Sequence, residues 1–365
     1  MKKRILLITG SFGNGHLQVS GNLKEMFEKK YKDRVIVDEC DLFLQAHPRL
    51  TSVLRKLYLY SFSYFRNVYG YLYYMGKNNK QTSAYRYFSY HYLYSKIEKF
   101  KPDIIVSTFP TPALTLLKNK KIPIVNVVTD YHFHKSWLTE NALKYFVPCE
   151  NTKIQFIEAG VKEKNIKVLG LPISEKFDIR ISKKQWLAKN NLDIKKETLL
   201  LVAGAFGVLK NFNKIVDAIL ARNKNIQLAI VCGKNVKLKN LLKRLYKENY
   251  HVKILGYTTN MREWMQASTV IVTKAGGVTI TESLASNIPL VLLKPVPGQE
   301  KENALYFEKN NMAKIADTNR ELVDIISKLL ENKQQLIEIK KNMAQNYLPN
   351  ATEKICEDIV KIIKV

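Results

Sequence analysis

Short runs of apolar, often β-branched residues recur along the chain and alternate with longer amphipathic stretches. In the first half, the runs that predict strands are residues Ile5–Thr9, Val35–Cys40, Ile104–Thr108, Ile124–Thr129 and Tyr145–Pro148. After Pro172 the pattern starts again with Leu199–Ala203, Gln227–Cys232, Val252–Leu255, Val270–Thr273, Leu290–Leu293 and Lys314–Ala316. Continuous apolar runs are typical of parallel strands that are buried on both faces. Because helical patterns of about 10–15 residues separate them, we predict two doubly wound α/β sheets.

The restart of the pattern predicts two domains. A polar stretch between Leu171 and Thr198 separates the halves, so we place an N-terminal domain at 1–172 and a C-terminal domain at 173–349. The amphipathic segment 350–365 can pack on either domain, and we expect it on the N-terminal one. Glycines follow predicted strands at Gly10–Gly15, Gly204–Gly207, Gly233 and Gly276–Gly277. Since ligands of such sheets bind beyond the carboxyl ends of the strands, we expect the two domains to face a ligand-binding cleft.

Composition narrows the class of protein. The chain has 365 residues, of which 46% are hydrophobic, and this is typical of a globular protein with a sizeable core. The formal net charge of +27 predicts attraction to nucleic acid, anionic lipid or phosphorylated substrates. Four widely spaced cysteines indicate neither a zinc site nor a disulfide framework and suit a reducing compartment. No apolar run approaches the roughly 20 residues that cross a bilayer, so we expect a soluble or peripheral protein.

One segment, 42–98, interrupts the α/β pattern. Between residues 42 and 97 there are eight Lys or Arg and no Asp or Glu, and 12 of the 20 tyrosines lie between Tyr58 and Tyr94. Tyrosine favours the water–lipid boundary, and each basic residue near an anionic membrane contributes about 1 kcal/mol of attraction. Aromatic stacking beside positive charge also suits single-stranded nucleic acid, and packed helices are a third interpretation. We favour docking on a membrane surface.

The first strand leads into a turn that can bind an anion. Arg4–His16 reads as an apolar run, then a loop with three glycines, then a histidine where a helix begins. Unpaired amide groups and the helix dipole favour negative charge at such a point. The motif differs from the dinucleotide fingerprint because its last position is a titratable imidazole. His16 can accept a proton from a group bound over the loop, although a helix-capping histidine is the simpler alternative.

The second half contains a pattern suited to a nucleoside diphosphate sugar. Thr273–Glu282 places two glycines after a strand and at the start of a helix, where amide groups suit a pyrophosphate and Lys274 adds positive charge. Glu282 follows in the helix, and its carboxylate can accept both hydroxyl groups of a ribose. Pro295–Asn303 then brings amide and carboxylate groups suited to sugar hydroxyls. Either loop alone is a weak signal, but their order and spacing together are a strong one.

These motifs together resemble a known family. Ser11–His16, Thr129–Trp137, Ala203–Val208, Lys274–Glu282 and Pro297–Asn303 resemble the processive diacylglycerol β-glucosyltransferases of Gram-positive bacteria. That family is similar to plant monogalactosyldiacylglycerol synthases and, more distantly, to the glycosyltransferase that makes lipid II. The resemblance covers nearly the whole chain, including the tyrosine-rich segment. One departure is Ala275, where relatives often have proline, and it alters the rigidity of the loop but not its amide donors.

The resemblance implies a GT-B fold of two Rossmann-like domains, with the acceptor bound by the first and the UDP-sugar by the second. It also implies an inverting transfer from UDP-glucose to the 3-hydroxyl of 1,2-diacylglycerol, repeated on the product to make the glycolipid anchor of lipoteichoic acid. No metal and no cofactor are expected. The expected partners are the UDP-sugar, diacylglycerol and anionic lipids, without nucleic acid. The expected location is the cytoplasmic face of the cell membrane, as a peripheral protein.

The same reasoning assigns candidate residues. His16 is the expected base, while Asp130 either orients His16 or is itself the base. The donor-binding candidates are Gly13, Asn14, Gly15, Gly207, Val208, Lys274, Gly276, Gly277, Thr279, Glu282, Gln299, Glu300 and Asn303. The acceptor and membrane candidates are Arg55, Lys56, Tyr58, Tyr60, Phe65, Arg66, Tyr69, Tyr73, His132, His134 and Trp137.

Three other functions compete with this hypothesis. A UDP-galactose-dependent monogalactosyldiacylglycerol synthase, or another lipid glycosyltransferase, would use the same loops. A UDP-sugar epimerase shares the fold but should lack the tyrosine-rich segment. A nucleic-acid-binding protein would explain the charge, but not the Glu282 helix or the Pro297–Asn303 loop.

Overall fold

The structure is a computed structural model that describes residues 2–11, 13–53, 87, 89–117, 121–203 and 212–364. The chain divides into two compact units. Unit 1 comprises Met1–Glu175, Pro297–Gln299 and Leu348–Val365, and unit 2 comprises Lys176–Val296 and Glu300–Tyr347.

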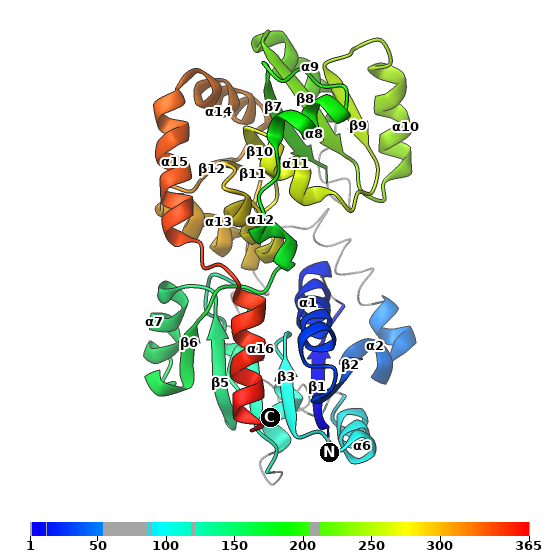
Figure 1. The fold of residues 1–365 in the computed structure, drawn as a ribbon, viewed down its shortest axis with the longest axis vertical. Helices are drawn as coiled ribbons and strands as arrows, with labels where there is room; N and C mark the ends of the chain where they lie inside the picture. The colour runs from blue at the N-terminus through cyan, green and yellow to red at the C-terminus, as the bar shows by residue number, and fades with distance from the viewer. Residues whose placement is uncertain are drawn as a thin grey trace. The chain divides into compact units, whose positions relative to one another are not determined.

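Unit 1 contains a six-stranded sheet, with the strand order β2-β1-β3-β4-β5-β6 and parallel pairing throughout. Figure 1 shows these strands, which are β1 (Lys3–Thr9), β2 (Val35–Asp41), β3 (Ile104–Ser107), β4 (Ile124–Val127), β5 (Ala142–Val147) and β6 (Ile166–Val168). The order reverses between β1 and β3, the kind of position at which α/β sheets bind ligands. Ile5 to Ile8 are fully buried, which explains why this strand is apolar at successive positions.

The described part of unit 1 contains five α-helices. They are α1 (Asn14–Lys30), α2 (Leu42–Ala46), α6 (Tyr90–Phe100), α7 (Glu150–Glu158) and α16 (Ala351–Ile362). The prediction of a long helix in every connection was wrong at two places. Between β3 and β4, the described residues form only a 3₁₀ helix, Pro112–Leu117, and between β4 and β5 only Lys135–Trp137. Proline at positions 110, 112 and 123 limits helix formation in the first of these connections. Strand β6 was not predicted, because three residues with one exposed lysine form no apolar run.

Helix α16, at the end of the chain, packs against α1. Ile355 and Ile359 are fully buried, and the Thr352 hydroxyl donates to the carbonyl of Ile173 at 2.6 Å. Lys30 on α1 forms ion pairs with Glu353 and Glu357 on α16. The C-terminal helix is therefore part of unit 1, although unit 2 precedes it in the sequence.

Unit 2 has the strand order β12-β11-β10-β7-β8-β9, again parallel. The strands are β7 (Glu197–Val202), β8 (Ile226–Val231), β9 (Val252–Leu255), β10 (Val270–Thr273), β11 (Leu290–Leu293) and β12 (Ala313–Ala316). This is the six-stranded Rossmann order, which reverses between β7 and β10. The predicted fold class, two doubly wound α/β sheets, is confirmed.

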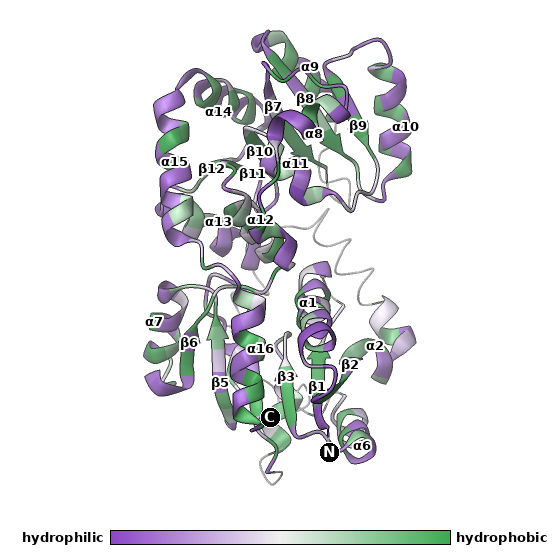
Figure 2. Cartoon of the chain, in the orientation of Figure 1, coloured by the Kyte–Doolittle hydropathy of each residue, from purple (hydrophilic) through white to green (hydrophobic). Residues whose placement is uncertain are grey.

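The helices of unit 2 bury apolar residues against the sheet or against neighbouring helices. They are α8 (Lys183–Lys189), α9 (Phe212–Arg222), α10 (Val236–Leu245), α11 (Met261–Ala267), α12 (Gly277–Ser286), α13 (Gln299–Lys309), α14 (Asn319–Glu331) and α15 (Lys333–Asn346). On α14, Leu322, Ile326 and Leu329 are buried at helical spacing. Figure 2 shows the strands of both units mainly in hydrophobic green, whereas helices such as α10 and α15 show much hydrophilic purple.

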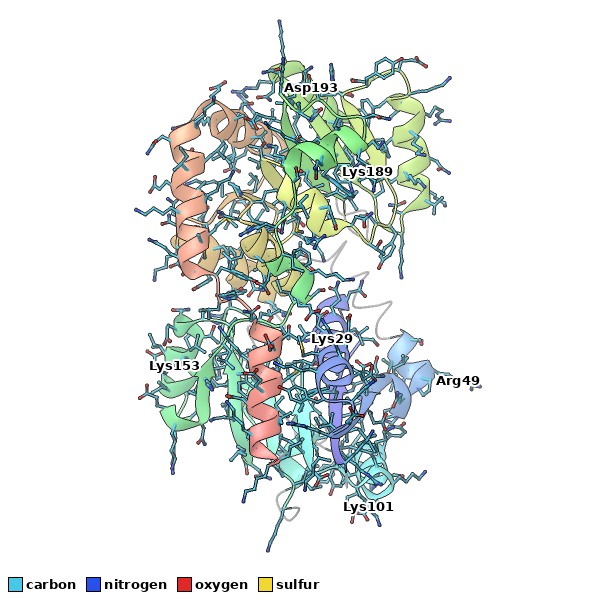
Figure 3. All side chains as sticks on the ribbon, in the orientation of Figure 1. Lys29, Arg49, Lys101, Lys153, Lys189 and Asp193 are labelled. Atoms are coloured by element: carbon cyan, nitrogen blue, oxygen red, sulfur yellow. The ribbon has the colours of Figure 1, made fainter. Side chains whose placement is uncertain are left out.

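The positive charge is distributed over many elements. In unit 1, Figure 3 labels Lys29 on α1, Arg49 after α2, Lys101 after α6 and Lys153 on α7. Among the described residues, no helix has both the length and the apolar character that a transmembrane segment requires.

Candidate functional site

The reversal of strand order in unit 1 brings together residues that are far apart in the sequence. His16 is the third residue of α1 and follows β1, Thr108 directly follows β3, and Asp130 comes shortly after β4. Because the carboxyl ends of parallel strands lie at one edge of a sheet, these three residues meet there.

The His16 imidazole is held by two oxygen atoms. Its Nδ1 lies 2.8 Å from the main-chain carbonyl oxygen of Thr108 and 3.1 Å from the Thr129 hydroxyl. The Phe109 ring contacts it edge-on, with 4.8 Å between ring centroids. None of the described residues forms a hydrogen bond with Nε2.

Asp130 is buried and accepts hydrogen bonds from two side chains. The Trp137 indole Nε1 donates to Oδ2 at 3.3 Å, and the Gln299 amide donates to Oδ1. Gln299 was predicted to bind the donor sugar, and the structure places it on this carboxylate within unit 1. The nearby Asp130 carboxylate acts on His16 through its charge, which favours the protonated imidazole.

Burial shifts both ionisable groups toward their neutral forms. It lowers the pKa of His16, an effect that the nearby Asp130 charge and the Thr108 hydrogen bond oppose. It raises the pKa of Asp130, against the effects of His16, Gln299 and Trp137. A neutral imidazole with an unbonded Nε2 is what a general base requires at neutral pH.

The predicted acceptor residues lie on the loop after β4. Trp137 is 1% exposed, and its ring centroid lies 6.4 Å from that of His16. His132 lies 3.2 Å from the Gln155 amide through Nδ1, and His134 caps the 3₁₀ helix Lys135–Trp137 by accepting from the Ser136 amide. Trp137 is therefore next to the imidazole, whereas His134 has a local structural role.

The turn before α1 leaves its amide groups without a side-chain cap. Gly13 is the N-cap, no side chain caps it, and no acidic residue lies in the first turn. Gly13 and Asn14 are exposed, and Gly15 is partly exposed. These three candidates therefore present main-chain donors suited to an anion.

In unit 2, the loop after β10 has a similar arrangement. Gly276 is the N-cap of α12, also without a side-chain cap, and Gly277 is the first helical residue. A Cβ atom added at Gly276 would have no neighbour within 4 Å. Thr279 is partly exposed in the first turn. The uncapped amide groups of this turn are main-chain donors of the kind suited to an anion.

Charged side chains flank this turn. Lys274 forms an ion pair with Glu300 at 3.0 Å, and the Glu300 side chain is only 11% exposed. Asn303 is fully buried, and its amide donates to the carbonyl oxygen of Ala275 at 3.3 Å, which supports the loop. Burial raises the pKa of Glu282 to about 8, so this carboxyl group is mainly protonated at neutral pH.

Several predicted residues cannot be placed. Gly207 and Val208 lie outside the described residues, as do the membrane candidates Arg55, Lys56, Tyr58, Tyr60, Phe65, Arg66, Tyr69 and Tyr73. Two residues were missed by the sequence analysis. Thr108 was placed at the end of a predicted strand, and Thr129 stood within a quoted motif, but only the folded sheet brings them to His16.

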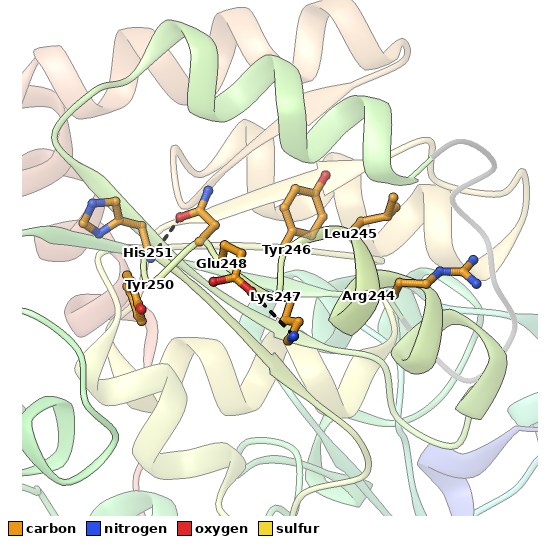
Figure 4. Close-up of a pocket in the computed structure, with 8 residues that line it drawn as sticks. Arg244, Leu245, Tyr246, Lys247, Glu248, Tyr250 and His251 are labelled. Carbon is orange, nitrogen blue, oxygen red and sulfur yellow. Dashed lines mark hydrogen bonds and ion pairs between the residues drawn. The ribbon is translucent and has the colours of Figure 1, made fainter.

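Across the described ranges, no group of three or more His, Cys, Asp or Glu side chains could hold a metal ion. A pocket of about 570 Å³ in unit 2 is lined by residues 244–251 (Figure 4). It contains none of the predicted site residues.

Comparison with known families accounts for both halves of the chain. Residues 16–173 match the family of monogalactosyldiacylglycerol (MGDG) synthases, and residues 198–355 match the glycosyltransferase family 28 C-terminal domain. A curated relative, a processive diacylglycerol β-glucosyltransferase from Staphylococcus aureus strain MRSA252, is 44% identical over 364 residues. That match covers 99% of this chain and 93% of the relative.

Solved structures share the fold at low sequence identity. Acinetobacter baumannii MurG has a TM-score of 0.66 and 15% identity, covering 98% of this chain and 99% of that one. Staphylococcus aureus MnaA, solved with UDP, has a TM-score of 0.65 and 14% identity, covering 99% and 97%. These likenesses confirm the GT-B fold. The match to the curated relatives, at 44% identity over 99% of the chain, also shows the family. The chain belongs to the family of processive diacylglycerol β-glucosyltransferases.

Proposed function

We propose that the protein transfers glucose from UDP-glucose to the 3-hydroxyl of 1,2-diacylglycerol with inversion, and then adds a second glucose to the product. Family membership supports the reaction. The structural observation that carries it is the His16 imidazole, held through Nδ1 with Nε2 unbonded by any described residue. An inverting transfer requires one base to activate the alcohol and one stabilised leaving group, and this imidazole fits the first task.

In the proposed mechanism, His16 Nε2 removes the proton from the acceptor hydroxyl. The oxygen then attacks the anomeric carbon of glucose on the face opposite UDP, and the glycosidic bond to the diphosphate breaks. The Asp130 carboxylate stabilises the imidazolium that forms, because its charge favours the protonated ring. This assigns the base to His16 and a supporting role to Asp130.

The leaving diphosphate is proposed to bind at the start of α12. The uncapped amides of Gly277 and the residues after it, together with Lys274, offset the negative charge that develops. We place the ribose on Glu282 and the hexose near Glu300, with Asn303 supporting the loop. Further contacts with the donor are proposed for Gly207, Val208 and the amides of Gly13, Asn14 and Gly15. Gln299 remains a candidate for binding the hexose. UDP and UDP-glucose are bound in solved structures of the same fold, which supports this class of donor.

We also propose that segment 42–98 docks the protein on the cytoplasmic face of the cell membrane. The described ends of this segment expose apolar side chains, with Leu50 at 47%, Val53 at 54% and Tyr87 at 58%. Arg49, beside Leu50, is also exposed. Neutralising Arg55, Lys56 and Arg66 together should weaken sedimentation with anionic vesicles without unfolding the protein, and unchanged sedimentation would contradict this role.

The direct test uses purified protein and vesicles that contain diacylglycerol. Each UDP-hexose is added separately, and the glycolipids are resolved by mass spectrometry. We expect glucosyl- and then diglucosyl-diacylglycerol from UDP-glucose. A product from UDP-galactose alone would favour the alternative, a monogalactosyldiacylglycerol synthase, which the match of residues 16–173 supports. Absence of any glycolipid from every donor would refute both functions.

A further inference from the structure

The orientation of the His16 ring depends on two uncharged groups that the mechanism above does not use. We propose that Thr129 is a positioning residue which, with the main-chain carbonyl of Thr108, holds His16 in the tautomer protonated at Nδ1. The lone pair of Nε2 then stays available for the acceptor proton. This inference depends on the proposed function only in treating His16 as the base.

The contacts define the tautomer. A carbonyl oxygen can only accept a hydrogen bond, so the 2.8 Å contact with Thr108 requires a proton on Nδ1. Since Nδ1 already carries that proton, the Thr129 hydroxyl oxygen, at 3.1 Å, must also accept from it. A neutral imidazole has one N–H group, and therefore Nε2 is left as the acceptor.

The surroundings keep both oxygen atoms in place. Thr108 is fully buried, and its amide donates to the carbonyl oxygen of Ile8 at 2.9 Å, which fixes it to the end of β1. Thr129 is 3% exposed and leaves the neighbouring strand, β4. The Phe109 ring packs edge-on against the imidazole. The ring is therefore restrained by two strand ends and an aromatic neighbour.

Orientation and charge come from different groups in this arrangement. Asp130, next to Thr129 in the sequence, is the charged group that acts on His16, and His132 in turn acts on Asp130. Neutral acceptors on Nδ1 stabilise the imidazolium less than a directly bonded carboxylate would. The imidazole can thus stay neutral before the reaction and still gain from the Asp130 charge once it is protonated.

Thr129→Val tests the inference, because it removes the hydroxyl and keeps the shape of the side chain. We expect kcat to fall about three- to tenfold, the effect of one lost hydrogen bond, with unchanged KM for UDP-glucose. We also expect the acid limb of the pH profile to move to lower pH by about half to one pH unit. That direction follows because an acceptor that stabilises the charged ring is lost. Thr129→Ser, which retains the hydroxyl, should restore both values.

Thr115→Val is the matched control. Thr115 is also buried, and its hydroxyl donates to a main-chain carbonyl, that of Pro112 at 2.7 Å. It should leave kcat and the pH profile unchanged, and thermal unfolding of both valine variants reports any loss of folding. If Thr129→Val and Thr115→Val have the same kinetics, the inference is wrong.

A spectroscopic measurement separates this inference from the proposed function. Imidazole ¹⁵N shifts of histidine-labelled protein, with His16 assigned from a His16→Gln variant, should show protonated Nδ1 and unprotonated Nε2 at neutral pH. Thr129→Val should increase the fraction of the other tautomer. An Nε2–H ring in the unsubstituted protein would overturn the inference. Persistence of glucosyl transfer in His16→Gln would instead overturn the role of His16 as base, whatever its tautomer.

Discussion

The N-terminal turns of α1 and α12 have the same main-chain arrangement but carry different side chains. Each helix follows a buried parallel strand beside the reversal in strand order, and each starts at a glycine N-cap without a side-chain cap. In α1, the third residue is His16, whose ring returns to the neighbouring strand ends. In α12, no imidazole is present, and Glu282 lies in the second turn.

Burial acts on both ionisable groups, with opposite consequences for their hydrogen bonding. It lowers the pKa of His16, which favours a neutral imidazole at the proposed base, and it raises the pKa of Glu282 to about 8, which favours a neutral carboxyl group that can donate and accept hydrogen bonds. The same strand–turn–helix unit can therefore serve proton transfer in one place and ligand binding in another. In this proposal, the side chains in the first two turns of the helix decide between the two tasks.

Removal of the imidazole should produce the largest effect. His16→Ala deletes the proposed base, and general base catalysis contributes about 10²–10⁴-fold, so we expect turnover to fall within that range. UDP affinity, measured by calorimetry, should change little, because the proposed diphosphate contacts lie on α12. Near-normal turnover would show that the two turns do not differ as we describe.

A negative charge at the α12 turn should weaken UDP binding, and we expect this effect to be smaller than the loss of turnover in His16→Ala. Gly276→Asp has room for its side chain and provides an N-cap, so the free energy of unfolding should rise by a few tenths of a kcal/mol. The carboxylate would compete with the diphosphate for the same amides, and we expect UDP to bind at least about tenfold more weakly. Gly276→Ala, which adds no charge, is the control for steric effects. Equal UDP affinity in both variants would exclude α12 as the anion site.

The last expected effect is a change in the pH dependence of stability. The pKa of Glu282 is raised in the folded protein from 4.5 to about 8, so ionisation of this group opposes folding. Its contribution is most favourable below about pH 4.5 and is lost progressively as the pH rises to about 8. Glu282→Gln should therefore raise Tm at pH 8–9, with a difference that shrinks toward pH 4.5. Parallel Tm profiles would contradict this burial effect.

The sequence predicted the sheets better than their connections. Runs such as Val270–Thr273 and Leu290–Leu293 were placed with their observed bounds, because strands buried on both faces are apolar at every position. The connection after β3 was predicted as a helix, but it contains prolines, and its described residues form only the 3₁₀ helix Pro112–Leu117. Periodicity alone did not capture that restriction.

For the candidate site, the sequence indicated candidate residues but not their contacts. His16 and Asp130 were found from motifs, since their residue types indicate proton transfer. The roles of Thr108 and Thr129 depend on contacts across 92 and 113 positions of sequence, which only the strand order creates. The contact of Asn303 could not be predicted either. Its full burial and its hydrogen bond to the carbonyl oxygen of Ala275 follow from the packing of α13.

The position of α16 has a consequence for biosynthesis. During translation, the nascent chain emerges with residues 1–175 long before Ile355 and Ile359 leave the ribosome, so the surface of α1 that α16 covers stays exposed to solvent until α16 has been made. An exposed apolar surface of this kind can associate with other chains. Premature termination shortly before residue 351 would thus harm the earliest-made part of the protein, and a fragment ending there should aggregate although its own sheet is complete.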